Sequence, residues 1–143
     1  MIQFSGDYPV PVSDSLRQLL INLITPELEK LNIINLPGAV TLNFRDPDYT
    51  AERGGYHPVE IRVEIKDSEG RISYITDFCY VGQGFCTELA KALDFDFSGG
   101  EFGSLGFPYV PITEADEIYA TWEENFLTYY RMGVFNVTVT LED

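Results

Sequence analysis

Apolar and polar residues alternate with a period of two in four stretches of the chain, a pattern typical of strands with one buried face. The clearest stretch is 59–66, where valine and isoleucine alternate with glutamate, arginine and lysine. The other three stretches span residues 40–44, 72–80 and 134–141. Asp67-Ser68-Glu69-Gly70 follows the clearest strand, so we expect the chain to turn there and form a hairpin.

Apolar residues recur at helical spacing in two longer stretches. The first begins after Ser13 or Asp14, either of which can cap a helix, and Pro26 is expected to end or kink it. The second runs from Thr113 to Gly133 and has acidic residues in its first turn, where the helix dipole favours them. Its apolar stripe is expected to be core and consists of Ala115, Ile118, Tyr119, Trp122, Phe126 and Tyr130.

Residues 82–111 separate the third expected strand from the second long helix. Gly82-Gln83-Gly84 predicts a tight turn, and residues 87–93 predict a short helix. Residues 94–111 hold four glycines among aromatic residues and predict an ordered but irregular loop. Because free loops rarely carry so many aromatic side chains, those of this loop are expected to pack onto the core. They are Phe95, Phe97, Phe102, Phe107 and Tyr109.

Together these elements predict an α+β fold. We expect an antiparallel sheet of about four strands, with two main helices packed on one face and a long aromatic-rich loop. A length of 143 residues suits one domain, so residues 1–143 are expected to form a single domain. A domain of this size can bury a sufficient core without disulfides. We therefore expect Cys79 and Cys86 to be reduced thiols, as in a cytoplasmic protein.

Acidic residues dominate the charge of the chain and exclude several kinds of partner. The formal net charge is -14, of which residues 1–93 contribute -5 and residues 94–143 contribute -9. Such a surface repels nucleic-acid phosphates and anionic lipid, and it attracts basic proteins. The first residues lack a basic segment followed by an apolar run, and no apolar run reaches membrane-spanning length. The sequence thus predicts a cytoplasmic protein that contacts neither membrane nor nucleic acid directly.

The densest group of polar side chains lies between residues 45 and 62, around two glycines and the single histidine. A loop held by two strands can present such groups as a site. Its arginines can clamp a carboxylate or phosphate, and its histidine can act as a general acid or base. The alternative is an internal salt-bridge network that fixes a long loop. The candidate ligand-binding residues are Arg45, Asp46, Glu52, Arg53, His57, Glu60 and Arg62.

The sequence predicts no catalytic residue and no cofactor. A nucleophilic triad would have to use His57 as its base, and no local signature joins it to either cysteine. A weak calcium alternative uses Asp94, Asp96 and Ser98, which match the first half of a calcium-binding loop. The twelfth position of that loop needs a bidentate acid, and Leu105 occupies it. The pattern therefore favours an ordinary turn over a metal site.

Several longer motifs resemble a known family. They are Asn43-Phe44-Arg45-Asp46-Pro47, the segment 51–62 (AERGGYHPVEIR), the segments 74–78 (YITDF) and 80–84 (YVGQG), Leu93-Asp94-Phe95-Asp96-Phe97 and Met132-Gly133-Val134-Phe135. In these motifs the chain resembles the bacterial family catalogued as domain of unknown function 2787, from about the first expected strand to the end. The resemblance implies a small bacterial cytoplasmic protein, and it implies no activity, cofactor or catalytic residue.

The biochemical function stays unknown at this level, with two classes in competition. The interpretation we favour is a non-enzymatic acidic protein that binds an unidentified partner, which the charge suggests is basic, with a homodimer as a further possibility. The alternative is a small enzyme or an anionic-ligand-binding domain that uses the segment from Arg45 to Arg62. The alternative predicts a pocket on which Arg45, Arg53 and His57 converge.

Overall fold

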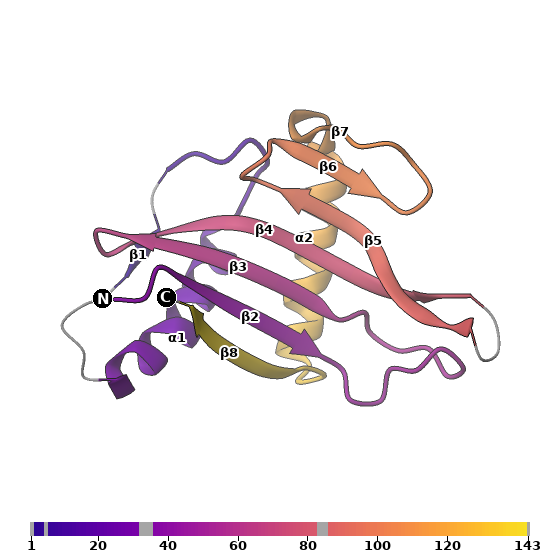
Figure 1. The fold of residues 1–143 in the computed structure, drawn as a ribbon, viewed down its shortest axis with the longest axis horizontal. Coiled ribbons are helices and arrows are strands. Elements are labelled where there is room, and N and C mark those ends of the chain that lie inside the picture. Colours follow the sequence, from indigo (N-terminus) through magenta and orange to yellow (C-terminus); the bar gives the residue numbers. More distant parts are fainter. Residues whose placement is uncertain (1, 5, 32–35, 83–85, 143) are drawn as a thin grey trace.

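The structure is a computed structural model that describes residues 2–4, 6–31, 36–82 and 86–142. It consists of a large sheet and two helices (Figure 1). The elements in chain order are β1 (Gln3–Phe4), α1 (Asp14–Leu31), β2 (Ala39–Arg45), β3 (Val59–Lys66), β4 (Glu69–Val81), β5 (Glu88–Asp96), β6 (Glu101–Ser104), β7 (Val110–Pro111), the 3-10 helix η2 (Ile112–Ala115), α2 (Asp116–Arg131) and β8 (Asn136–Glu142).

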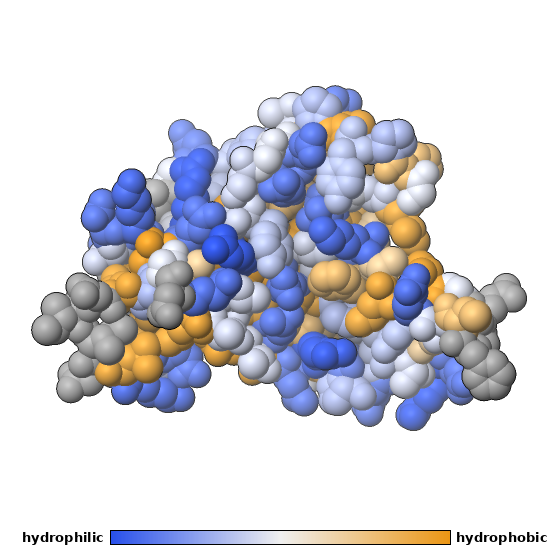
Figure 2. Space-filling view, in the orientation of Figure 1, coloured by the Kyte–Doolittle hydropathy of each residue, from blue (hydrophilic) through white to orange (hydrophobic). Residues whose placement is uncertain are grey.

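The strands of the described residues form one eight-stranded sheet. Seven of them follow the order β7-β6-β5-β4-β3-β2-β8, in which each neighbouring pair is antiparallel. The short β1 pairs with β4 in the parallel sense. Both helices lie on the same face of this sheet (Figure 1). The opposite face is solvent-facing, and hydrophilic side chains run across its middle (Figure 2).

The core lies between the sheet and the two helices, because the period-two pattern of the strands points one side chain in two toward the helices. In β3 the residues at 59, 61, 63 and 65 are buried, as the alternation predicts. Leu16, Leu20 and Ile24 of α1 and Tyr119, Trp122 and Phe126 of α2 belong to the same buried cluster. Each of these side chains contributes about 1.5–3 kcal/mol through burial.

The predicted α+β class with two helices and an antiparallel sheet is confirmed, whereas the predicted number of strands is wrong. The four predicted strands correspond to β2, β3, β4 and β8. The short helix predicted for residues 87–93 is also wrong. These residues lie mostly within β5, which pairs with β4. The segment 94–111 is also more regular than expected, because it completes β5 and forms β6 and β7.

Several side chains also differ from expectation. Phe95 and Phe102 are buried as predicted, but Phe107 is 73% exposed and Tyr109 is 47% exposed. Ile118, expected in the core, is 46% exposed on α2. Pro26 does not end α1, which continues to Leu31. Gln83 and Gly84 of the predicted tight turn lie outside the described residues.

One position in β4 matters for the site. The pairing between β4 and β5 shifts register between Asp77 and Phe78, because the pairing skips Ala92 of β5. On the other side of β4, the Phe78 backbone N–H donates to the Pro58 carbonyl at 2.9 Å, next to the pair of Val59 and Asp77. Asp77 is the register partner of Val59, whose side chain is buried on the helix side of the sheet. A carboxylate therefore stands where the apolar core ends.

None of the helices within the described residues is long and apolar enough to cross a membrane.

Candidate functional site

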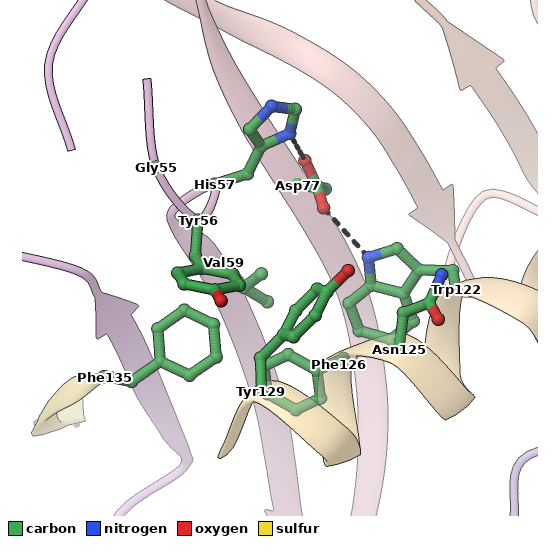
Figure 3. A pocket seen from close by; sticks show the side chains of 10 residues that line it. All are labelled: Gly55, Tyr56, His57, Val59, Asp77, Trp122, Asn125, Phe126, Tyr129 and Phe135. Carbon is green, nitrogen blue, oxygen red and sulfur yellow. Dashed lines mark hydrogen bonds and ion pairs between the residues drawn. The ribbon is translucent and has the colours of Figure 1, made fainter. Parts of the chain in front are cut away.

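A cavity of about 300 Å³ opens where α2 passes the ends of β3 and β4. We call it the aromatic pocket, because aromatic rings form most of its wall (Figure 3). The loop between β2 and β3 closes one side, and the residue before β8 closes another. It is lined by Gly55, Tyr56, His57, Val59, Asp77, Trp122, Asn125, Phe126, Tyr129 and Phe135.

The loop that closes the pocket is fixed by Asp46. Its Oδ2 accepts a hydrogen bond from the Tyr56 backbone N–H at 3.0 Å, and its Oδ1 accepts one from the Asp48 backbone N–H at 2.9 Å. Gly55 has a φ of +137°, and a Cβ atom there would lie 2.8 Å from Asp46 Oδ2. Glycine is therefore required at this position, and the close approach sets where Tyr56 and His57 enter the pocket.

A chain of two hydrogen bonds crosses the upper rim of the pocket (Figure 3). His57 Nδ1 lies 2.7 Å from Asp77 Oδ1, and the Trp122 indole N–H donates to Asp77 Oδ2 at 3.0 Å. Asp77 is mostly shielded, with 13% of its side chain exposed, whereas 43% of the His57 side chain is exposed. Asp77 thus holds the imidazole in one orientation, with Nε2 on the side of the ring away from the carboxylate.

The protonation of His57 is coupled to this arrangement. The hydrogen bond to Asp77 raises the pKa of His57 above its usual range, and desolvation of the ring opposes that increase. The negative charge of Asp77 adds to the rise in pKa. A larger fraction of the imidazole is therefore protonated near neutral pH than in a free histidine, which makes the His57–Asp77 pair closer to electrically neutral as a unit.

The aromatic wall is packed from several elements. The Tyr56 and Tyr129 rings lie 4.6 Å apart between centroids, and Trp122 stacks on Phe126 at 5.0 Å with an angle of 10° between the ring planes. Outside the pocket, Tyr49 lies 5.6 Å from the His57 ring and supports it from the loop side. Such a wall suits a flat or apolar ligand group, and aromatic faces also attract cations.

The predicted site residues do not converge as a group. His57 alone of the seven candidates lines the pocket, and Asp46 supports it through the loop. Arg45, Glu52 and Arg53 are exposed, and none of the three lines the aromatic pocket. The remaining two, Glu60 and Arg62, lie on the other face of the sheet: Glu60 accepts a hydrogen bond from the Tyr74 hydroxyl, and Arg62 forms ion pairs with Glu64 and Glu142.

The residues of the calcium alternative have local partners of their own. Asp94, on β5, accepts hydrogen bonds from Thr76 Oγ1 at 2.8 Å and from the Tyr109 hydroxyl at 2.7 Å. Asp96 accepts one from the Gly99 backbone N–H, and Ser98 Oγ lies 3.0 Å from Ser73 Oγ. Within the described part of the chain, no group of three or more histidine, cysteine, aspartate or glutamate side chains is arranged to hold a metal ion.

Asp77, Trp122 and Tyr129 line the pocket but are not among the candidate site residues predicted from the sequence. One signal for Asp77 is in the sequence: it is the only charged residue within the expected strand 72–80, where most side chains are apolar or aromatic. Trp122 was interpreted as core, and it is 7% exposed, but its N–H reaches Asp77 at the pocket rim. The contact joins α2 to β4 across 45 residues, so no local pattern could reveal it.

The fold and the site together define an α+β protein with an open aromatic pocket beside an exposed histidine. Residues 14–140 match the family described as protein of unknown function, DUF2787, and the chain belongs to that family. The resemblance expected from the loop and strand motifs is therefore confirmed.

Two solved structures from Vibrio cholerae share the fold. One is a hypothetical protein from the VSP-II pathogenicity island, which is 34% identical, with a TM-score of 0.89, covering 99% of this chain and 100% of that one. The other is a conserved hypothetical protein from pathogenicity island VPI-2, which is 36% identical, with a TM-score of 0.82, covering 96% of this chain and 100% of that one. The second is described as sharing structural homology with the human P32 protein. A search of curated proteins found no match.

Proposed function

We propose that this protein is a non-enzymatic binding protein that holds a flat, largely apolar group of its partner in the aromatic pocket. The observation that carries the proposal is the composition of the pocket wall. Five aromatic side chains line it, and its histidine and its carboxylate, His57 and Asp77, are already bonded to each other. Aromatic pockets of this kind anchor ligands and partner side chains, because burying a ring face there removes much apolar area from water.

The pocket also lacks features that many enzyme sites need. No serine, threonine, cysteine or lysine is among the described residues that line it. Cys79 and Cys86 are both free and lie elsewhere, and burial raises the pKa of the Cys79 thiol, which makes that thiol less reactive. These observations support binding over nucleophilic catalysis. The free thiols and the net charge of -14 also support a cytoplasmic protein with a basic partner.

The test uses the single tryptophan as the reporter, because Trp122 lines the pocket. Benzamidine and N-acetyl-phenylalanine amide are titrated while Trp122 fluorescence and the melting temperature are measured. We expect saturable fluorescence changes and a raised melting temperature. Tyr129→Ala should weaken binding about tenfold, whereas Phe107→Ala, which removes an exposed ring outside the pocket, should leave it unchanged. An absence of saturable binding, or equal effects of the two variants, would overturn the proposal.

A general acid–base enzyme is the second candidate, and the 2.7 Å contact between His57 and Asp77 favours it. A carboxylate that orients an imidazole is a common arrangement for proton transfer. The test measures hydrolysis of p-nitrophenyl acetate and p-nitrophenyl phosphate. A rate that follows the ionisation of His57 and is lost in His57→Gln would favour the enzyme. Unchanged background rates together with retained ligand binding in His57→Gln would favour the binding protein.

A further inference from the structure

We infer that the aromatic pocket is one end of a longer groove along α2, and that this groove binds an extended basic segment of a partner protein. The inference rests on the proposed function and deepens it by naming the partner's chemistry. A second hollow of about 420 Å³ adjoins the aromatic pocket. It is lined by Leu93, Glu117, Ile118, Thr121, Trp122 and Asn125.

The two hollows share part of their walls. Trp122 and Asn125 line both of them. Asp77 of the aromatic pocket and Leu93 of the second hollow are register partners across β4 and β5, so their backbones are adjacent in the sheet. From Glu117 to Tyr129 the lining residues follow one side of α2 over about 18 Å. An extended peptide covers that length with about five or six residues.

The second hollow offers apolar surface that the core does not use. Ile118 belongs to the apolar stripe of α2, yet 46% of it is exposed, and Leu93 beside it is only partly buried. An exposed apolar side chain next to a hollow favours contact with an apolar side chain of a partner. The groove therefore has two places for side chains, an apolar one beside Ile118 and an aromatic one beside Tyr129.

The charges of the groove select the partner. Its acidic and basic lining residues are Glu117, Asp77 and His57, and no lysine or arginine is among the described residues that line either hollow. Glu114 of η2 and Asp116 of α2 directly precede Glu117 and add exposed negative charge there. Arginine fits both parts of this environment, because its planar guanidinium stacks on aromatic rings and pairs with carboxylates. A segment that alternates leucine and arginine therefore matches the groove.

Three synthetic heptapeptides test the inference at low salt, with Trp122 fluorescence as the readout. The first alternates leucine and arginine, the second replaces its arginines with glutamine, and the third replaces its leucines with serine. We expect the first to bind at least about tenfold more tightly than either of the others. Equal binding of the arginine and glutamine peptides would overturn the inference.

Matched variants locate the contact. Glu117→Gln and Ile118→Ser should each weaken binding of the leucine–arginine peptide about threefold to tenfold. Glu29→Gln removes the same charge at an exposed position of α1, outside the lining, and should change binding less than about twofold. Because Glu29, Glu117 and Ile118 are exposed, all three variants should keep the melting temperature of the parent. Equal effects of Glu29→Gln and Glu117→Gln would overturn the groove.

The outcomes separate this inference from the proposed function. If benzamidine binds in a Tyr129-dependent manner but Ile118→Ser leaves peptide binding unchanged, the groove is wrong and the binding pocket stands. If neither benzamidine nor the peptide binds, both are wrong. The other possible occupant of the groove is a second copy of the chain, and sedimentation velocity tests for it. A dimer that dissociates in Ile118→Ser, and that the peptide does not disrupt, would assign the groove to the second copy and overturn the inference.

Discussion

His57 is the only histidine of the chain, so its ionisation can be followed without ambiguity. Because Asp77 raises the pKa of His57, its imidazole resonance should titrate with a midpoint above 6.5, the ordinary value. Asp77→Asn removes the negative charge and replaces one carboxylate oxygen by an amide NH2 group, and should move the midpoint down. Nuclear magnetic resonance of the ring protons measures this. Asp48→Asn, at an exposed loop carboxylate, serves as the control and should leave the midpoint in place. An unchanged midpoint in Asp77→Asn would contradict the pairing of His57 with Asp77.

The same pair makes the stability of the fold depend on pH. A group whose pKa is higher in the folded state stabilises the fold fully below its unfolded pKa, and this contribution is lost as pH rises through the folded pKa. The free energy of unfolding of the parent minus that of His57→Gln should therefore be larger at pH 5.5 than at pH 9. Because the ring is almost half exposed, the difference should be at most about 1 kcal/mol. Urea unfolding at the two values measures it, and a difference that grows with pH would refute it.

At the scale of elements, Glu123 ties the two helices together. It is 6% exposed, and its Oε2 accepts hydrogen bonds from the Tyr119 hydroxyl at 2.7 Å and from the Ser13 backbone N–H at 3.0 Å. Burial and this carboxylate raise the pKa of Tyr119 far above its usual range. Ser13 directly precedes α1, so a residue of α2 satisfies a donor at the start of α1.

Replacing Glu123 should therefore be costly. Glu123→Ala leaves two donors without their acceptor and should lower the free energy of unfolding by about 2–3 kcal/mol. Glu124→Ala changes the adjacent, exposed residue and should alter stability by less than about 0.5 kcal/mol. Urea unfolding of both variants provides the comparison. Similar losses in the two variants would show that the link between the helices contributes nothing.

The short strands β6 and β7 depend on a close contact between Gly103 and Tyr109. A Cβ atom at Gly103 would lie 2.5 Å from the Tyr109 ring. Gly103→Ala should therefore displace Tyr109 from Asp94 and lower the free energy of unfolding by about 1–3 kcal/mol. The hydrogen bond to Asp94 raises the pKa of Tyr109 to about 12, so displacement should also lower that pKa. In a Tyr109→Ala background the same change should cost little, and an undiminished cost there would rule out the contact.

The elements show why the sequence predicted only part of the sheet. Alternation identified β3 because its charged and apolar residues are strictly interleaved. Residues 89–93 are Leu-Ala-Lys-Ala-Leu, all good helix formers, so local propensity favoured a helix there. In the fold this segment is part of β5, which pairs with β4 along a ladder whose outermost pairs are Val81 with Glu88 and Tyr74 with Asp96. The hydrogen bonds of this ladder outweigh the local helix propensity. The site was predictable only at His57, since Asp77 and Trp122 reach it through long-range packing.

At the scale of the whole molecule, the acidic excess after residue 93 is not one surface. Asp94 and Glu123 are buried in internal hydrogen bonds, and Glu142 pairs with Arg62 on the polar face of the sheet. Other acidic residues cluster at the start of α2, beside the proposed groove. The acidic residues that are concentrated late in the sequence therefore form only a local cluster of negative charge in the structure. The inferred basic partner would contact that cluster.

The net charge of -14 also acts on the fold as a whole, because exposed carboxylates repel one another in the compact state. Salt shortens the screening length from about 30 Å at 0.01 M to about 8 Å at 0.15 M, so the melting temperature should rise by several degrees over that range. Glu52→Lys, at an exposed loop position, reduces the net negative charge by two and should flatten this dependence. Differential scanning calorimetry in sodium chloride and in potassium chloride measures it, and agreement between the two salts excludes binding of a particular cation. A melting temperature that falls with salt would mean that attractive pairs such as Arg62–Glu142 outweigh the repulsion among the acids.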